Sequence, residues 1–313
     1  MAAALFSIFV FPGLLFLCIA GWAAEYIDRK VYAKLQNRIG PPWFQPFADF
    51  IKLLAKAEVI PTAANVRMFQ LAPLFAFTSV ATVFIYLPVL SPRSFYSFDG
   101  DIIMVLYLLT VPTLAFFIGG WYSTSLFARL GSVRAVTQLF AYEVPLFMSI
   151  LAAALLANSW SLEKIVLFYN EHPWACLINL IGFAVAVVAL LGKLEKVPFD
   201  IPEAETEIVA GPFTEYSGRL FAVLRMTVDM EMIVGATLLL AVFCPMWFLF
   251  GPVLGFFVYL VEVLAVILLL ALLRTVVARL RIDQMVDFCW KYLVPLAVFQ
   301  LLLNLALKGI LFR

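Results

Sequence analysis

The chain has 313 residues, of which 65% are apolar and 13% charged, whereas a soluble globular protein has roughly 45–50% and ~25%. This composition excludes a water-soluble fold, because so few polar groups could not cover that much apolar surface. The net charge of +1 gives no basic field for nucleic acid. Four widely separated cysteines and a single histidine argue against a disulfide framework and against a metal or iron–sulfur site built by this chain alone.

Runs of mostly apolar residues predict the membrane-spanning helices, each of which needs about 20 such residues. Eight runs meet this requirement: 5–24, 69–90, 102–120, 139–158, 174–192, 226–250, 252–273 and 292–312. The first run lacks the positively charged start of a signal peptide, so we expect it to remain as a helix. Phe250-Gly251-Pro252 predicts a tight hairpin between the sixth and seventh helices. Because no repeat or Gly/Ser linker interrupts the chain, we expect one transmembrane domain over 1–313.

The uneven distribution of lysine and arginine predicts the orientation of the chain. Nearly all of these residues lie in the odd-numbered loops, and the even-numbered loops contain only Arg93 and Lys164. Cytoplasmic loops carry the excess of Lys and Arg in membrane proteins. We therefore expect a multi-pass protein of the cell membrane with cytoplasmic odd-numbered loops, both termini outside, and a working surface on the cytoplasmic side.

The first loop combines a proline-rich passage at 39–46 with a helical pattern directly after it. Prolines force the passage into an extended or turning path. Phe47, Phe50, Ile51 and Leu54 then follow at i, i+3, i+4 and i+7. This spacing predicts an amphipathic helix on the membrane surface or against a partner, and a simple interfacial anchor remains the alternative.

The fifth loop, 193–219, is rich in carboxylates: Glu195, Asp200, Glu203, Glu205, Glu207 and Glu215. Pro202 suits the first turn of a helix, on which we expect Asp200 to act as the cap and Glu203 and Glu207 to share a face. Like charges so placed repel each other, and shielding from water would raise the pKa of at least one carboxyl. A solvated acidic loop remains the alternative.

Acidic residues also occur within the predicted membrane helices: Glu143, Asp229, Glu231 and Glu262. Ionisable groups at membrane depth are costly and mark ion pathways or buried ion pairs. A single one could pair with an arginine such as Arg225 or Arg274. Together with the acidic fifth loop, the set favours a proton or sodium relay.

Several motifs make the chain similar to a known family. They span nearly the whole sequence: Tyr26–Lys30, Gln36–Pro41, Gln45–Leu53, Arg134, Gln138, Tyr142–Pro145, Pro198–Gly211, Thr214–Ser217, Asp283–Met285 and Trp290–Pro295. With these motifs the chain resembles the H-type membrane subunit of respiratory complex I and its relatives in membrane-bound, ion-translocating hydrogenases. The family's eight-helix, all-α membrane fold agrees with the spans predicted above.

The resemblance implies a membrane anchor without a redox centre, catalytic residue or cofactor of its own. Iron–sulfur clusters, and nickel–iron in a hydrogenase, would lie in a cytoplasmic hydrogenase-like large subunit and an iron–sulfur small subunit. Small membrane subunits and antiporter-like subunits would be the membrane partners. The implied proton or ion relay comprises Glu143, Glu203, Glu205, Glu207, Glu215, Asp229, Glu231 and Glu262. The implied docking and structural residues are Asp28, Arg29, Arg38, Pro41, Pro42, Asp49, Lys52, Pro198, Asp200, Arg219 and Arg225.

Departures from the family pattern favour one branch. The passage 40–45 is shorter than in the quinone-reducing members, Lys193 and Val228 stand where complex I commonly has glutamates, and Glu262 replaces a family lysine. Segment 218–225 resembles the hydrogenase branch. We therefore expect a ferredoxin-linked complex of the membrane-bound hydrogenase or sulfur-reductase type, without bound quinone. A quinone-binding complex I subunit is the first alternative, and a stand-alone transporter is the second.

Overall fold

A computed structural model describes the backbone of residues 2–311, and the side chains of these residues except 2–5, 205, 252, 310 and 311. Throughout this part of the chain the regular elements are helices. Their bounds are α1 (Ala2–Phe9), α2 (Leu14–Leu35), α3 (Gln45–Ala55), α4 (Val66–Tyr86), α5 (Asp101–Tyr122), α6 (Leu126–Ala157), α7 (Leu162–Glu171), α8 (Ala175–Ile178), α9 (Leu180–Lys193), α10 (Glu205–Ile208), α11 (Gly218–Phe243), α12 (Pro252–Val276), α13 (Ile282–Phe288) and α14 (Val294–Leu311). Short turns η1 (Gly211–Phe213), η2 (Met246–Leu249) and η3 (Cys289–Leu293) connect them.

Seven of the helical segments within 2–311 are long and apolar enough to cross a membrane. They are Phe6–Leu35, Val66–Tyr86, Asp101–Tyr122, Leu126–Ala157, Gly218–Phe243, Val253–Val276 and Ile282–Gly309. The all-α membrane fold predicted from the sequence is therefore confirmed. The fifth predicted span, 174–192, differs, because it divides into the short α8 and the 14-residue α9. A polar cluster marks this division, where buried Asn179 donates to the Tyr169 hydroxyl.

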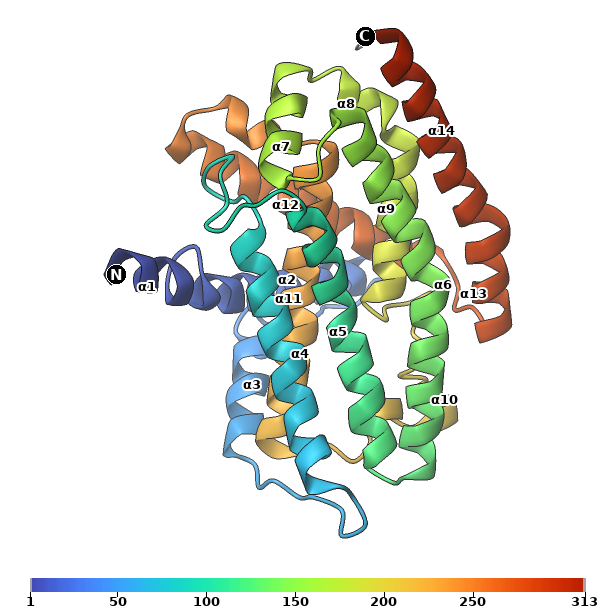
Figure 1. Ribbon diagram of the computed structural model, residues 1–313. Coiled ribbons are helices and arrows are strands. Elements are labelled where there is room, and N and C mark those ends of the chain that lie inside the picture. Colours follow the sequence, from blue (N-terminus) through green and yellow to red (C-terminus); the bar gives the residue numbers. More distant parts are fainter. Residues whose placement is uncertain (1, 312–313) are drawn as a thin grey trace.

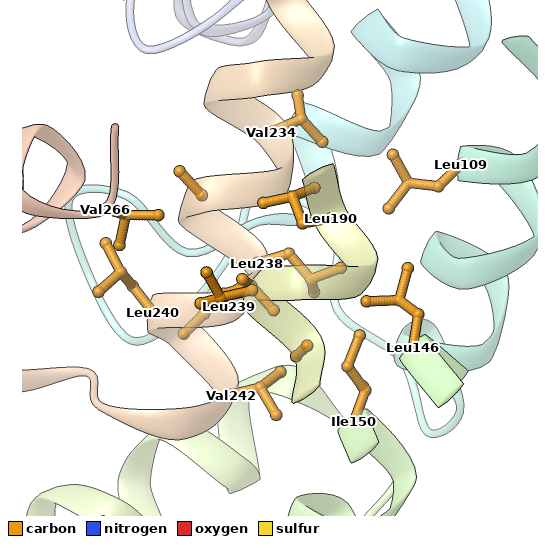
Figure 2. Packing of buried hydrophobic residues seen from close by; sticks show 14 of the residues in the cluster. Leu109, Leu146, Ile150, Leu190, Val234, Leu238, Leu239, Leu240, Val242 and Val266 are labelled. Atoms are coloured by element: carbon orange, nitrogen blue, oxygen red, sulfur yellow. The ribbon is translucent and has the colours of Figure 1, made fainter. Parts of the chain in front are cut away.

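Helix α11 forms the centre of the bundle, and its residues from Asp229 to Phe243 are buried. In Figure 1, α4, α5 and α6 run side by side, α14 lies along one edge, and α3 and α10 lie toward the same end of the bundle. Figure 2 shows the apolar core where Leu109 of α5, Ile150 of α6, Leu190 of α9 and Leu238 of α11 meet. The same core continues to Val266 of α12. This packing brings α5, α6, α9 and α11 close enough to share polar groups as well.

The surface helix predicted in the first loop is α3, which begins at Gln45. Phe47 and Phe50 pack against Trp22 of α2, and their ring centroids lie 5.1 and 5.3 Å, respectively, from that of Trp22. Ile51 and Leu54 stay exposed, at 48% and 40% of their surface. Helix α3 is thus anchored through two aromatic rings and leaves apolar side chains free, as an amphipathic surface helix requires.

The fifth loop packs closely on the bundle through two glycines. Gly211 adopts a positive φ of 51°, and a Cβ there would lie 1.7 Å from the Pro202 carbonyl oxygen. A Cβ at Gly131 of α6 would lie 2.5 Å from the Cα of Gly211. A side chain at Gly131 would separate η1 from α6, and one at Gly211 would clash with the Pro202 carbonyl within the loop, so these glycines fix the shape of the loop and its position against the helix end.

Candidate functional site: two charged cavities and a buried ion pair

Two adjoining cavities lie between the fifth loop and the helices. The first, which we call the charged cavity, has a volume of about 340 Å³ and is lined by residues of α2, α9, α11, α12 and the fifth loop. The second, which we call the surface-helix cavity, has a volume of about 390 Å³ and lies between α3 and α11. Glu203, Arg225 and Asp229 line both. Ionisable side chains therefore connect the two spaces.

A network of five charged side chains borders the charged cavity, which three of them, Glu25, Lys196 and Arg274, line. Lys196 Nζ lies 2.7 Å from Asp28 Oδ2 and 3.3 Å from Glu25 Oε2. Arg274 Nη1 lies 2.8 Å from the same oxygen of Asp28, and Arg29 Nε lies 2.6 Å from Glu25 Oε1. Asp28 is fully buried. Because each carboxylate faces two cations, the network ties α2 to α12 and to the fifth loop with its charges compensated.

Lys193 and Glu231 form a second, deeper ion pair. Lys193 Nζ lies 3.0 Å from Glu231 Oε1, and the two side chains are only 2% and 1% exposed. Lys193 Nζ also donates to the carbonyl oxygen of Leu109 in α5. The pair thus joins the end of α9 to α11 and α5, and both residues also line the charged cavity.

Glu195 and Asp229 are two further carboxylates of the charged cavity. Burial, and after it the charges of Glu203 and Glu231, raise the pKa of Glu195 well above its usual range. Asp229 is 6% exposed and has Arg225 as a neighbouring opposite charge. Glu195 lines the charged cavity, and its raised pKa makes this carboxyl easier to protonate there than an exposed glutamate.

Glu143 lies beyond the ion pair, on α6. It is partly buried and lines a narrow cavity of about 10 Å³ together with Tyr142 and Lys193. The positive charge of Lys193 acts on its carboxylate. The structure therefore brings three predicted relay residues, Asp229, Glu231 and Glu143, to successive positions that begin at the charged cavity.

The outer carboxylates of the fifth loop are arranged differently from the prediction. Helix α10 begins at Glu205 instead of near Pro202, and no side chain caps its start. Asp200 instead pairs with Arg279, with 2.9 Å between Oδ1 and Nε. The helix therefore begins later than predicted, and the capping role of Asp200 stays a prediction.

Glu203 and Glu207 do not form the predicted repelling pair, because Glu203 lies before the helix. Glu203 Oε1 lies 3.9 Å from Arg225, while Glu207 Oε2 accepts a 2.7 Å bond from Arg134. The hydrogen bond from Arg134 lowers the pKa of Glu207, and its side chain is 53% exposed. Glu207 is thus an ionised surface carboxylate.

The remaining predicted relay residues lie apart. The side chain of Glu205 is outside the described part of the structure. Glu215 is partly buried but lines neither charged space. Glu262 lines a separate, mostly apolar cavity of about 370 Å³ beside Cys176 and Cys244. Within the described residues no group of three or more His, Cys, Asp or Glu is placed to hold a metal ion.

The predicted docking residues fall into two groups. The exposed residues are Arg38, Pro42, Lys52 and Arg219, and the partly exposed ones are Arg29, Pro41, Asp49 and Arg225. Arg29 lies 3.6 Å from the Asp49 carboxylate. Asp28 and Pro198 are buried and cannot touch a partner. Beside the exposed group, Ile39 and Trp43 are 90% and 77% exposed. The tip of the first loop therefore presents apolar and basic side chains together.

Four charged residues of the site were not among the predicted relay and docking residues: Glu25, Lys193, Glu195 and Lys196. A signal existed for Glu25, which precedes Asp28 by three residues, so that both lie on one face of α2. Lys193 and Lys196 pair with residues of other elements, and Lys196 and Asp28 are 168 residues apart in the chain. Spacing along the chain cannot reveal such pairs.

Comparison with known proteins adds three findings. The family model for NADH dehydrogenase matches residues 6–305. The chain is 33% identical over 321 residues to the H-type subunit of the NADH-quinone oxidoreductase of Bacillus thuringiensis (strain Al Hakam) and to that of Bacillus cereus (strain AH187), covering 98% of this chain and 96% of each relative. Among solved structures, it is similar to a chain of the membrane-bound sulfane sulfur reductase, an archaeal respiratory membrane complex. The TM-score is 0.84 at 27% sequence identity, and the match covers 97% of this chain and 98% of that chain.

Proposed function

We propose that this chain anchors the redox module of a ferredoxin-linked, ion-translocating oxidoreductase and provides the entry to the ion path. The proposal starts from the family, because the chain belongs to the NADH dehydrogenase family and is an H-type membrane subunit of a multi-subunit respiratory complex. The observation that carries this proposal is the sequence of ionisable groups from the charged cavity through Lys193–Glu231 to Glu143. Charges buried in series at membrane depth are costly and are typical of ion pathways.

The first and fifth loops are the proposed docking platform. Exposed Ile39 and Trp43 stand beside the basic Arg38, and exposed aromatic and arginine side chains are enriched at protein interfaces. The uneven Lys and Arg distribution supports a cytoplasmic position for both loops. Iron–sulfur clusters, and nickel–iron in a hydrogenase, would belong to the large and small subunits docked there, and small and antiporter-like membrane subunits would continue the path for H⁺ or Na⁺.

A quinone-binding subunit is the second candidate. It is supported by the 33% identity to the H-type subunits of NADH-quinone oxidoreductases and by the surface-helix cavity of about 390 Å³. The shortened 40–45 passage and the branch-specific residues favour the ferredoxin-linked interpretation instead. Quinone extracted from the purified complex, with turnover that depends on it, would decide for the second candidate.

The relay is tested with Glu143→Gln, which removes a proton site while nearly preserving the shape of the side chain. Redox turnover and ion uptake are measured together in inverted membrane vesicles that contain the complete complex. We expect normal assembly and loss of ion uptake. The matched control is Glu163→Gln, which removes a carboxylate from an exposed pair with Arg93. Uptake at the control level by the Glu143 variant would refute its place in the relay.

A further inference from the structure

Lys193 occupies the boundary between two cavities. Among the described residues it alone lines both the charged cavity and the narrow cavity beside Glu143. It is the last residue of α9, and its ammonium contacts Glu231 at 3.0 Å and the carbonyl of Leu109. The direct route for a charge between the two cavities therefore passes this side chain.

The backbone around Lys193 is fixed, whereas its side chain can reorient. Gln138 of α6 donates to the carbonyls of Gly192 and Phe199, at 2.7 and 2.8 Å, and so clamps the chain on both sides of Lys193. The lysine stem has four rotatable carbons and a compact ammonium with three donors. Pro112 of α5 cannot donate to the Leu108 carbonyl four residues before it, which lies next to the Leu109 carbonyl.

The charged and titratable groups around the ammonium come from two helices and the fifth loop. Glu231 faces it from α11, Glu143 and Tyr142 from α6, and Glu195 from the start of the fifth loop. Tyr142 is held by a hydrogen bond of 3.2 Å with Thr113 of α5. One cation thus stands between two carboxylates of the path, Glu231 on one side and Glu143 on the other.

Resting on the proposed function, we propose that Lys193 is the switching cation of the ion path, which pairs alternately with Glu231 and Glu143. A proton from the charged cavity neutralises the Glu231 carboxylate, and the ammonium turns to Glu143, which releases its proton toward the next membrane subunit. When the ammonium returns, Glu231 passes its proton to Glu143. Lys193 keeps its own proton throughout, so one cycle moves one proton from the cavity into the membrane path.

If Lys193 and Glu231 form only a structural ion pair, a different result is expected. Replacing a buried ion pair by neutral side chains of similar volume is often harmless to stability, whereas removing one partner leaves an unpaired buried charge. The informative variant is therefore the neutral pair Lys193→Met with Glu231→Gln, compared with Lys193→Arg, which keeps the charge. Lys164→Met, which removes an exposed lysine paired with Asp99, is the control.

The experiment measures assembly of the complete complex and ions transported per electron in inverted vesicles. We expect the neutral pair to assemble and its ion-to-electron ratio to fall by about a hundredfold, the scale of a lost proton-transfer group. Lys193→Arg should retain a higher ratio than the neutral pair, and Lys164→Met should match the wild type.

Two results would overturn the switch. One is a wild-type ratio in the neutral pair. The other is failure of the neutral pair to assemble while Lys193→Arg assembles normally, which would assign the pair a role in holding helices. If the neutral pair transports ions normally and Glu143→Gln does not, the switch is refuted and the proposed function stands.

Discussion

Asp28 shows at the residue scale how charge can be held in the interior of a membrane protein. Its carboxylate accepts from Lys196 and Arg274 at 2.7 and 2.8 Å, and no part of its surface is exposed. Arg274 also stacks over the ring of Tyr32, at 4.2 Å from its centroid. The negative charge of Asp28 therefore compensates the positive charges of Lys196 and Arg274, independently of any part that Asp28 plays in ion transport.

Asp28→Asn is expected to destabilise the protein by about 3–5 kcal/mol, because it leaves two cations facing a neutral amide. Thermal unfolding of the purified complex, followed by labelling of exposed cysteines, measures this loss. Asp99→Asn is the control, since Asp99 and its partner Lys164 are exposed and such pairs contribute little. Equal melting temperatures for the two variants would contradict the network.

Glu195 gives the pH dependence expected of a buried carboxyl. Because burial raises its pKa in the folded state, the folded state holds a proton that the unfolded state has released. Its contribution to stability therefore falls as pH rises above the ordinary pKa of 4.5. Glu195→Gln removes this loss, so the stability of the variant relative to wild type should increase as pH rises above 4.5. Melting temperatures of both proteins across this range provide the measurement, and a constant difference would count against the raised pKa.

At the element scale, close backbone approach sets the position of the fifth loop. Gly211 combines a positive φ with a Cβ position already occupied by the Pro202 carbonyl. Its neighbour across the interface is Gly131 of α6. The helix and the irregular loop thus meet through backbone atoms, which explains how a loop with so many carboxylates keeps a defined shape.

Gly211→Ala is expected to cost about 1–3 kcal/mol through strain and displacement of the loop, and to weaken retention of the redox subunits. Gly309→Ala serves as the control, because a Cβ there meets nothing within 4 Å. Protease sensitivity of the fifth loop and subunit retention on gel filtration report the two effects. A Gly211 variant that matches the Gly309 variant in both would show that the close approach is dispensable.

The elements were predictable from the sequence where hydrophobic periodicity decides them. The surface helix expected around 47–54 is α3, and most of the long spans overlap their predicted positions. The fifth span was overestimated, because buried Asn179 accepts from Gln300 and Asn304 at a break that hydropathy alone does not register. The carboxylates of the membrane helices could be recognised in the sequence as charged residues within apolar runs, but their lysine partners depend on tertiary packing.

At the scale of the whole molecule, the features divide between the surface and the interior. The first loop carries exposed Ile39 and Trp43, and Glu207 remains an ionised surface carboxylate. The buried charges begin at the charged cavity and continue to Glu143. Docking and ion transfer should therefore be separable by mutation.

Replacing Ile39 and Trp43 together by serine is expected to weaken binding of the redox module by about 2 kcal/mol or more, as for an aromatic hot spot, without unfolding the protein. Co-purification at rising salt concentration, combined with the melting temperature of the membrane part, separates the two effects. Phe95→Ser, at an exposed aromatic in another loop, is the matched change. Full retention of the module by the double variant would place the docking surface elsewhere.

If the buried acids couple electron transfer to ion transport, the number of ions transported per electron depends on their carboxyl groups. The double variant Glu143→Gln with Asp229→Asn is measured in inverted vesicles against Glu163→Gln. We expect this double variant to assemble and its ratio to fall close to zero while electron transfer continues or slows. A double variant with the ratio of the control would contradict this coupling.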